Sequence, residues 1–202
     1  MNIYSIYSIC GPSGSGKSTV CEKICEGIKV CVVKEDWYYI PLKEGEDPTT
    51  HNFDIPSSLD WEKFVSDVRK LKNGEEIEAP VYDFVTHSRT GTQKVIPEKL
   101  IIIEGILLFT CEELRNLSSL LIYVDADQIT CFLRRKERDM KERGRTLESV
   151  EKQYKEQVYP AFKEFVEPSS KHANITIHNS KNDDYTGFDF IKECTKLKFG
   201  SN

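Results

Sequence analysis

The octet Gly-Pro-Ser-Gly-Ser-Gly-Lys-Ser at residues 11–18 constrains this chain more than any other feature, because it matches the pattern G-x-x-x-x-G-K-[ST]. Its glycines let the backbone curl, so that successive N–H groups point at the oxygens of a phosphate. In such a loop the lysine reaches the β- and γ-phosphates, and the last hydroxyl can hold Mg²⁺. The residues predicted to bind a nucleotide phosphate are Gly11, Ser13, Gly14, Ser15, Gly16, Lys17, Ser18 and Thr19.

The residues on either side of the octet have the pattern that a strand–loop–helix unit requires. Isoleucine and tyrosine dominate residues 3–9, as in a short buried strand. After the octet, Val20, Ile24 and Ile28 recur every fourth residue and share one helical face. The octet is therefore interpreted as a phosphate-binding loop and not as a chance glycine-rich turn.

Short apolar runs alternate with helical patterns along the rest of the chain. Strands are predicted at 30–33, 100–103, 120–124 and 175–177, and further helices from Asp60 to Asn73, from about Gln128, from Leu147 and from Phe190. Pro160 is expected to kink or end the helix that starts at Leu147. This alternation predicts an α/β fold with a doubly wound parallel sheet, in a single domain over residues 1–202.

Two segments do not fit the alternation. Residues 40–59 are rich in proline and glycine and are predicted to form a long loop, which in a compact domain is usually functional or mobile. Residues 80–97 contain two β-prone runs, Val81–Val85 and Thr92–Ile96, around a polar turn with Gly91. They predict a β-hairpin.

The charge of the chain limits its partners. A formal net charge of −5 argues against sequence-independent binding of nucleic acid, which needs an excess of clustered cations. The basic residues gather instead between Arg134 and Arg145, a pattern that suits a compact anion such as triphosphate or a solvated helix face.

The cysteines and the amino terminus indicate a protein of a reducing compartment. The seven cysteines show no C-x-x-C pairing, so they are interpreted as free thiols, and Cys21 and Cys25 as core residues without a metal. The amino terminus shows no cationic region followed by an apolar run, and the apolar stretch Leu100–Phe109 is interrupted by Glu104. We therefore expect a cytoplasmic protein without a membrane partner.

Three acids, Asp36, Glu104 and Asp125, are predicted just beyond strand ends, where ligands bind in open α/β sheets. Phosphoryl transfer needs a group that orients the attacking hydroxyl, oxygen ligands for Mg²⁺ and cations around the transferred group. Asp36 can supply the first, Glu104 with Ser18 the second, and Lys17 with the arginine cluster the third.

Several longer stretches together resemble the uridine kinase family of P-loop nucleoside kinases. They are 35–39 (EDWYY), 52–54 (NFD), 80–89 (PVYDFVTHSR), 104–107 (EGIL), 134–145, and 153–154 leading to 160–162. The resemblance covers nearly the whole chain. It implies a P-loop NTPase-type sheet with an inserted β-hairpin at about 80–97 and a helical, arginine-rich lid at about 134–147.

The resemblance also implies a role for each matching residue. Asp36 would be the general base toward the nucleoside 5′-hydroxyl and would lie near Mg²⁺, with Ser18 and Glu104 as the other metal ligands. Lys17, Arg138 and Arg143 would act on the phosphates. The residues implied for the nucleoside are Tyr39, Asp54, Tyr82, Phe84, His87, Arg135, Arg145 and Gln153, and Asn182 would lie on the adenine side. A carboxylate at Asp54 that accepts from the 2′-hydroxyl would favour ribonucleosides.

The implied activity is 5′-phosphorylation of uridine and cytidine in a homotetramer, with ATP as the donor and GTP as the alternative donor. A kinase for phosphoribulose or pantothenate is the alternative among enzymes. The hairpin residues Tyr82, Phe84 and His87 argue against it, because those acceptors have no pyrimidine ring. A GTP-dependent switch is a third possibility, because residues 180–183 (SKND) partly match the guanine-binding pattern N-K-x-D.

Overall fold

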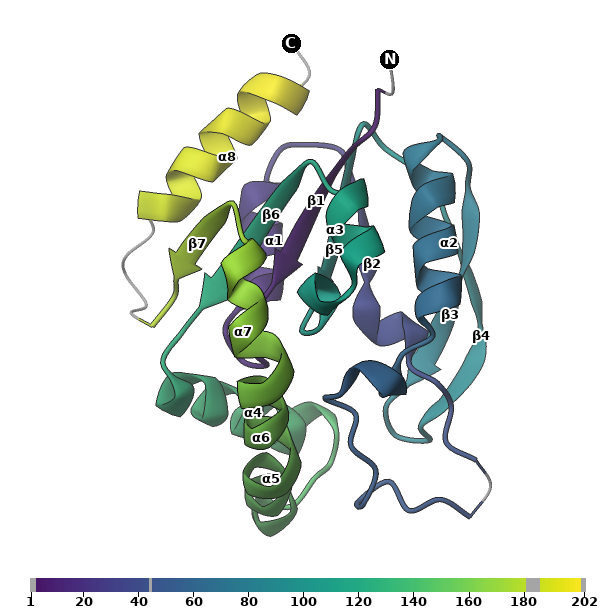
Figure 1. Ribbon diagram of the computed structural model, residues 1–202, viewed down its shortest axis with the longest axis vertical. Helices are drawn as coiled ribbons and strands as arrows, with labels where there is room; N and C mark the ends of the chain where they lie inside the picture. Colours follow the sequence, from purple (N-terminus) through teal and green to yellow (C-terminus); the bar gives the residue numbers. More distant parts are fainter. Residues whose placement is uncertain (1–2, 44, 181–185, 201–202) are drawn as a thin grey trace.

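Within the described residues, five parallel strands form the central sheet, in the order β2-β5-β1-β6-β7 (Figure 1). The computed structural model describes residues 3–43, 45–180 and 186–200. The strands are β1 (Ser5–Cys10), β2 (Val30–Lys34), β5 (Leu100–Gly105), β6 (Leu120–Asp125) and β7 (Ile175–His178). Because β1 is central, the phosphate-binding loop that follows it lies at the middle of the carboxyl edge of the sheet.

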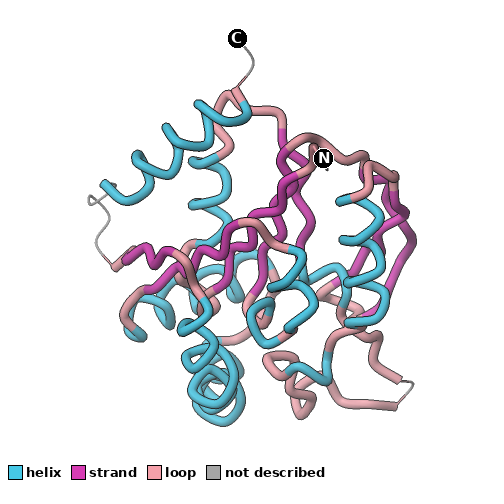
Figure 2. Tube along the Cα trace, turned by 45° about the horizontal axis from the view of Figure 1, so that its top comes forward, coloured by secondary structure: helices cyan, strands magenta, loops and turns pink. Residues whose placement is uncertain are grey.

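Helices cover both faces of this sheet, as the doubly wound prediction requires (Figure 2). Helices α1 (Lys17–Ile24) and α8 (Thr186–Phe199) pack on one face through Val20 and Phe188. Helices α2 (Trp61–Lys72) and α3 (Glu112–Leu117) pack on the other through Phe64 and Leu114. In β5, Ile102 packs on the side of α1 and α8, and Ile101 packs on the side of α2 and α3. Because both faces of this strand are covered, its apolar run is unbroken.

Several of the remaining elements lie around the carboxyl edge of the sheet (Figure 1). Helix α4 (Gln128–Glu142) starts where the sequence predicted, and Asp127 caps it by accepting from the N–H of Thr130. Short 3₁₀ turns occupy Glu35–Tyr38, Pro56–Ser58, Leu108–Thr110 and Ser170–His172. Apart from Pro56–Ser58 and an isolated bridge between Tyr39 and Leu59, the described part of 40–59 is irregular, which confirms the predicted loop.

The hairpin exists, but the predicted turn is wrong. Strands β3 (Ile77–Asp83) and β4 (Ser88–Val95) pair antiparallel, and the turn between them is 84–87. Asp83 stabilises this turn, because its carboxylate accepts from the N–H of Val85 at 2.9 Å and from the hydroxyl of Thr86 at 2.7 Å. Gly91 lies inside β4 opposite Val81, next to a shift in register.

Pro160 does not end the helix that starts at Leu147. The helical segment runs on to Ser169 through α5 (Leu147–Gln153), α6 (Tyr159–Ala161) and α7 (Glu167–Ser169), with π-helical turns at Tyr154–Val158 and Phe162–Val166 between them. Each π-helical turn ends two residues before a proline, Pro160 or Pro168. A π-turn shifts the hydrogen-bond register by one residue, so the backbone can pass a residue that lacks an N–H.

Within residues 3–43, 45–180 and 186–200, the structure contains no helix with the length and apolar character that a membrane crossing demands.

Replacing Asp60 with alanine is expected to lower the free energy of unfolding by about 1–2 kcal/mol. The Asp60 carboxylate caps α2 by accepting from the N–H of Lys63 at 3.1 Å, and its second oxygen accepts from Arg89 of β4 at 3.1 Å. Urea unfolding would measure the change. Asp60→Asn retains the capping oxygen and should lose less, so equal losses in both variants would contradict the capping role.

Candidate active site

The loop between β1 and α1 has the geometry of an anion-binding site. Gly14 and Gly16 adopt positive φ angles of 84° and 93°, and a side chain at Gly14 would collide with the carbonyl oxygen of Cys131 in α4. The N-cap residue of α1 is Gly16, which has no side chain to cap the helix, so the first N–H groups of α1 can bind a ligand. Lys17 lies across the loop, where its Nζ donates to the carbonyls of Gly11 and Pro12, both at 3.0 Å.

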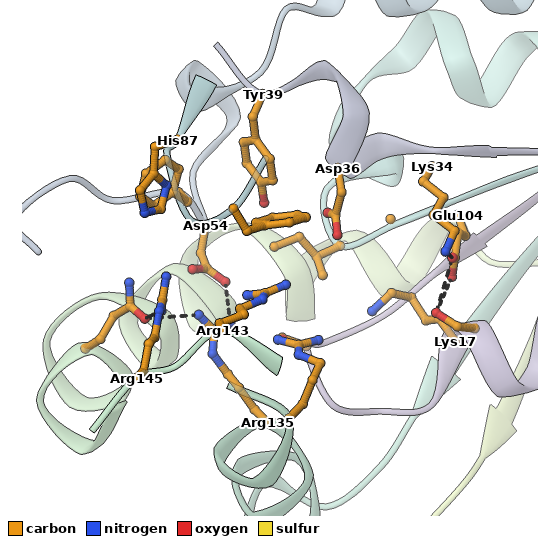
Figure 3. Close-up of a pocket in the computed structure, with 18 residues that line it drawn as sticks. Lys17, Lys34, Asp36, Tyr39, Asp54, His87, Glu104, Arg135, Arg143 and Arg145 are labelled. Carbon is orange, nitrogen blue, oxygen red and sulfur yellow. Dashed lines mark hydrogen bonds and ion pairs between the residues drawn. The ribbon is translucent and has the colours of Figure 1, made fainter. Parts of the chain in front are cut away.

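Oxygen ligands for a divalent cation lie beside this loop. The Ser18 hydroxyl donates to the carboxylate of Glu104 at 3.0 Å, and Lys34 Nζ lies 3.8 Å from the same carboxylate. Asp36, in the 3₁₀ turn after β2, lines one cavity together with Ser18 and Glu104 (Figure 3). A hydroxyl with one or two carboxylates is a donor set that suits Mg²⁺ in a kinase site, where phosphates and water complete the shell.

Within the described residues, no group of three or more His, Cys, Asp or Glu side chains is placed to hold a metal ion. Asp125, the third acid predicted at a strand end, does not join this site. Its Oδ2 lies 3.0 Å from Nδ1 of His178 at the exposed end of β6.

Facing the loop, arginines from α4 and the segment after it surround one buried acid. Asp139 is fully buried, and its carboxylate lies within 4 Å of four guanidinium groups. The distances are 3.4 Å to Arg135 Nε, 2.9 Å to Arg138 Nη2, 3.3 Å to Arg143 Nη1 and 3.6 Å to Arg145 Nη1. Arg138 also donates to the Ser13 hydroxyl at 3.4 Å, which connects the cluster to the phosphate-binding loop.

A second set of polar contacts lies on the other side of this cluster. Arg135 Nη1 donates to Asp54 Oδ1 at 3.1 Å, and both side chains are buried. Gln153 Oε1 accepts from Arg135 at 3.4 Å and from Arg145. Asp54 comes from the 40–59 loop and Gln153 from α5, so the loop and the helical segment contribute to one surface.

Aromatic side chains wall the cavity beside these groups. The imidazole of His87 stacks on Phe53 with 4.8 Å between ring centroids, and Tyr39 lies edge-on to Phe84 at 6.2 Å. The Arg143 guanidinium covers the Phe84 ring at 4.3 Å. These contacts form an apolar slot with cationic groups at its entrance.

His87 is the polar group of this slot. Burial, and then the charges of Arg145 and Arg143, lower the pKa of its imidazole, so the ring is neutral at pH 7. Its buried Nδ1 has no hydrogen-bond partner among the described residues, which leaves a polar atom for a ligand. The backbone of His87 has φ = 50° because it closes the tight hairpin turn.

One cavity brings most of the predicted site residues together (Figure 3). Its lining contains Ser13, Lys17, Ser18, Asp36, Tyr39, Asp54, Phe84, His87, Glu104, Arg135, Arg138, Arg143, Arg145 and Gln153. Gly11, Gly14, Ser15, Gly16 and Thr19 belong to the phosphate-binding loop and the start of α1 and are not part of this lining. Tyr82 lies behind the wall, against Tyr39 and Phe84. Asn182 lies outside the described residues.

Sequence reasoning missed several residues that support the site. Asp139 was read only as part of an arginine motif, and Phe53 as a neighbour of Asp54; no signal in the sequence gives the direction of either side chain. Asn179 donates from its side-chain amide to the carbonyl of Ser15 at 2.7 Å and accepts from Arg134 at its own carbonyl, so it fastens the loop after β7 to the phosphate-binding loop.

Glu35, next to Asp36, is also buried and was missed. Its Oε1 accepts from the N–H groups of Ile106 and Leu107, both at 3.1 Å, and these bonds hold the end of β2 against the end of β5. Burial, and then the charge of Asp36, raise the pKa of its carboxyl to about 8.

A phosphate-binding loop at the centre of a parallel sheet, facing an arginine cluster across one cavity, defines a P-loop protein. Residues 6–185 match the model of the phosphoribulokinase / uridine kinase family. The chain is 42% identical over 182 residues to the uridine kinase of Pasteurella multocida, with 85% of this chain and 84% of that protein aligned. It is 40% identical over 197 residues to the uridine kinase of Borrelia duttonii, covering 95% and 96% of the two chains. The chain therefore belongs to the phosphoribulokinase / uridine kinase family.

Solved structures agree on the fold. A possible uridine kinase from Bacillus stearothermophilus aligns with a TM-score of 0.60 at 21% identity, over 86% of this chain and 88% of that chain. Phosphoribulokinase from Rhodobacter spheroides aligns with a TM-score of 0.63 at 15% identity, over 88% and 71%. The P-loop kinase fold expected from the sequence is thereby confirmed.

The lowered pKa of His87 predicts how stability changes with pH. Below about pH 6.5 the unfolded chain binds a proton at this histidine that the folded protein resists, so stability falls as the pH falls through this window. His87→Asn cannot titrate, and asparagine tolerates a positive φ. Urea unfolding from pH 7.5 to 5 should show a steeper loss for the wild-type protein than for this variant. Parallel profiles would contradict the shift.

Proposed function

We propose that this protein transfers the γ-phosphoryl group of ATP to the 5′-hydroxyl of uridine and cytidine, giving UMP and CMP. One observation carries the proposal: a single cavity joins the phosphate-binding residues Lys17 and Ser18 to the polar and aromatic groups Asp54 and His87, with Asp36 also in its lining (Figure 3). The relatives named uridine kinase, at about 40% identity over most of the chain, support the same assignment, as does a 36% identical uridine-cytidine kinase A of Dictyostelium discoideum.

The aromatic slot would hold the pyrimidine. Phe53 and Phe84 offer apolar faces to the ring, and a neutral His87 can hydrogen bond to its polar edge. Tyr39 completes the lining, and Tyr82 supports the wall from behind. A pocket closed by a hairpin in this way favours a single ring over a purine.

The ribose would bind to the polar set next to the slot. Asp54, held by Arg135, can accept from the ribose hydroxyls, while Arg145 and Gln153 complete the surface. A deoxyribonucleoside would bring no 2′-hydroxyl to the Asp54 carboxylate, which would keep only its bond from Arg135, so ribonucleosides are the expected substrates.

The donor nucleotide would bind on the opposite side of the cavity. Backbone N–H groups of the loop would cradle the phosphates, and Lys17, Arg138 and Arg143 would stabilise the charge that develops on the transferred group. Ser18 and Glu104, with Asp36 nearby, would hold Mg²⁺, which neutralises phosphate charge when it is bound. ATP is the proposed donor and GTP the second; Asn182 remains a predicted adenine-side residue.

Asp36 would orient the 5′-hydroxyl and accept its proton. In a loose transition state the proton leaves late, so orientation is the larger part of this role. The arginine cluster would act as a lid that excludes water, which otherwise competes with the nucleoside for the phosphoryl group.

The remaining assignments concern the whole protein. We propose that residues 1–202 act as one kinase domain, that the protein is a cytoplasmic homo-oligomer, a tetramer by its family resemblance, and that it has no nucleic acid partner. Light scattering after size-exclusion chromatography measures the oligomeric state directly.

Two other functions receive less support. A sugar-phosphate acceptor, as in phosphoribulokinase, has no ring to fill the space that Phe53, Phe84 and His87 line. The guanine-binding pattern of a GTP switch would fall on residues 180–183, most of which lie outside the described residues.

Release of ADP from Mg-ATP tests the function, with uridine, cytidine, adenosine, deoxycytidine, ribulose 5-phosphate, pantothenate and no acceptor compared in parallel. Turnover restricted to uridine and cytidine is expected. Turnover with a sugar phosphate or pantothenate would replace the nucleoside assignment, and hydrolysis of GTP without an acceptor would favour the switch.

Asp36→Asn is expected to lower kcat by about 10²–10⁴-fold, because the neutral amide orients the hydroxyl less strongly than a carboxylate and cannot accept its proton. Binding of a non-hydrolysable ATP analogue, measured by calorimetry, should change little. Asp125→Asn is the matched control, since Asp125 also ends a strand but lies outside the cavity, and it should keep its activity. Equal loss of turnover and nucleotide binding in Asp36→Asn would make Asp36 a structural residue.

A further inference from the structure

Among the described residues, Asp139 is the only acid that forms ion pairs with all four arginines of the cavity. Its side chain is fully buried. Its Oδ2 pairs with Arg135 and Arg145, and its Oδ1 pairs with Arg138 and Arg143. Arg145 is also fixed through its backbone, because its N–H donates to the carbonyl of Asp139 at 3.1 Å. The carboxylate therefore holds the end of α4 and the chain after it in one arrangement.

The four arginines serve two different parts of the cavity. Arg135 and Arg145 contact Asp54 and Gln153, the polar groups of the nucleoside side. Arg138 contacts the Ser13 hydroxyl in the phosphate-binding loop. Arg143 covers Phe84 in the aromatic wall. Among the described side chains, the path of ion pairs from the nucleoside side to the phosphate side passes through Asp139.

Electrostatics explains why this carboxylate matters. Four guanidinium groups within a few ångströms repel one another in a medium that screens charge poorly, and burial makes the repulsion stronger. The negative charges of Asp139 and Asp54 offset part of the positive charge of the four arginines. The remaining positive charge can attract phosphates. Without the Asp139 charge the arginines would separate toward solvent and lose their shared geometry.

We propose that Asp139 is a positioning residue that couples nucleoside binding to ATP binding, by holding arginines of both subsites on one carboxylate. The inference rests on the proposed function. Binding of uridine would fix Arg135 and Arg145, Asp139 would be fixed with them, and Arg138 and Arg143 would then be held for the phosphates. Because coupling is reciprocal, ATP should strengthen uridine binding by the same factor.

Calorimetry with uridine and a non-hydrolysable ATP analogue tests this coupling. In the wild-type protein the analogue should tighten uridine binding by about fivefold or more, within the usual range of coupling between sites. In Asp139→Asn this factor should fall toward one, and the KM values for both uridine and ATP should rise. Asp139→Glu, which retains the charge, should recover part of the coupling.

Asp67→Asn is the matched control. Asp67 is also a buried acid, paired with Lys63 and the hydroxyl of Tyr38, but it lies outside the cavity. This variant should lose thermal stability and keep the wild-type coupling factor and KM values. If Asp139→Asn behaved in the same way, Asp139 would be structural only and the proposal would be wrong.

A double-mutant cycle with Arg135→Lys and Arg138→Lys covers the case in which Asp139→Asn does not fold. The two arginines share Asp139, so their effects on kcat/KM should be non-additive. Additive effects would overturn the proposal. It would also be overturned if the ATP analogue did not change the affinity of the wild-type protein for uridine. A wild-type protein that neither binds nor phosphorylates uridine would instead overturn the proposed function.

Discussion

Burial of β5 between two apolar layers sets the geometry on which the rest of the structure depends. Ile101 and Ile103 face one layer of helices, and Leu100 and Ile102 face the other. As is typical of a strand covered on both faces, β5 pairs in parallel with β1 and β2, and the carboxyl ends of all three therefore meet at one edge. The phosphate-binding loop, Asp36 and Glu104 follow or end these strands, and this common edge brings them into one cavity.

The second requirement is compensation of buried charge. Asp139, Arg135 and Asp54 are all buried, and each has a charged partner. Ionised groups without partners would be too costly in such an interior, whereas ion pairs between buried groups restrict the directions of both partners. The arginines therefore face the phosphate-binding loop in defined conformations. Long arginine side chains on an exposed helix would sample many conformations.

The sequence predicted the elements well because their signals are local. Asp60 caps α2, Asp127 precedes the start of α4, and the five sheet strands lie within a few residues of the expected runs. The errors arose where tertiary packing outweighed propensity. Asp83 fixes the hairpin turn ahead of Gly91, and π-helical turns carry the chain past Pro160, whose effect depends on register and not on the residue alone.

The amino-acid sequence by itself determined the phosphate-binding loop, the alternation of strands and helices and the residue types of the site, since these depend on neighbours within a few positions. Only the tertiary structure decided which side chains meet. The stacking of Phe53 on His87 joins two segments that lie far apart along the chain. The convergence of four arginines on Asp139 depends on side-chain directions that no local sequence pattern determines. Such contacts arise from the packing of the whole sheet and its helices, because burial and charge pairing act between residues that are distant in sequence.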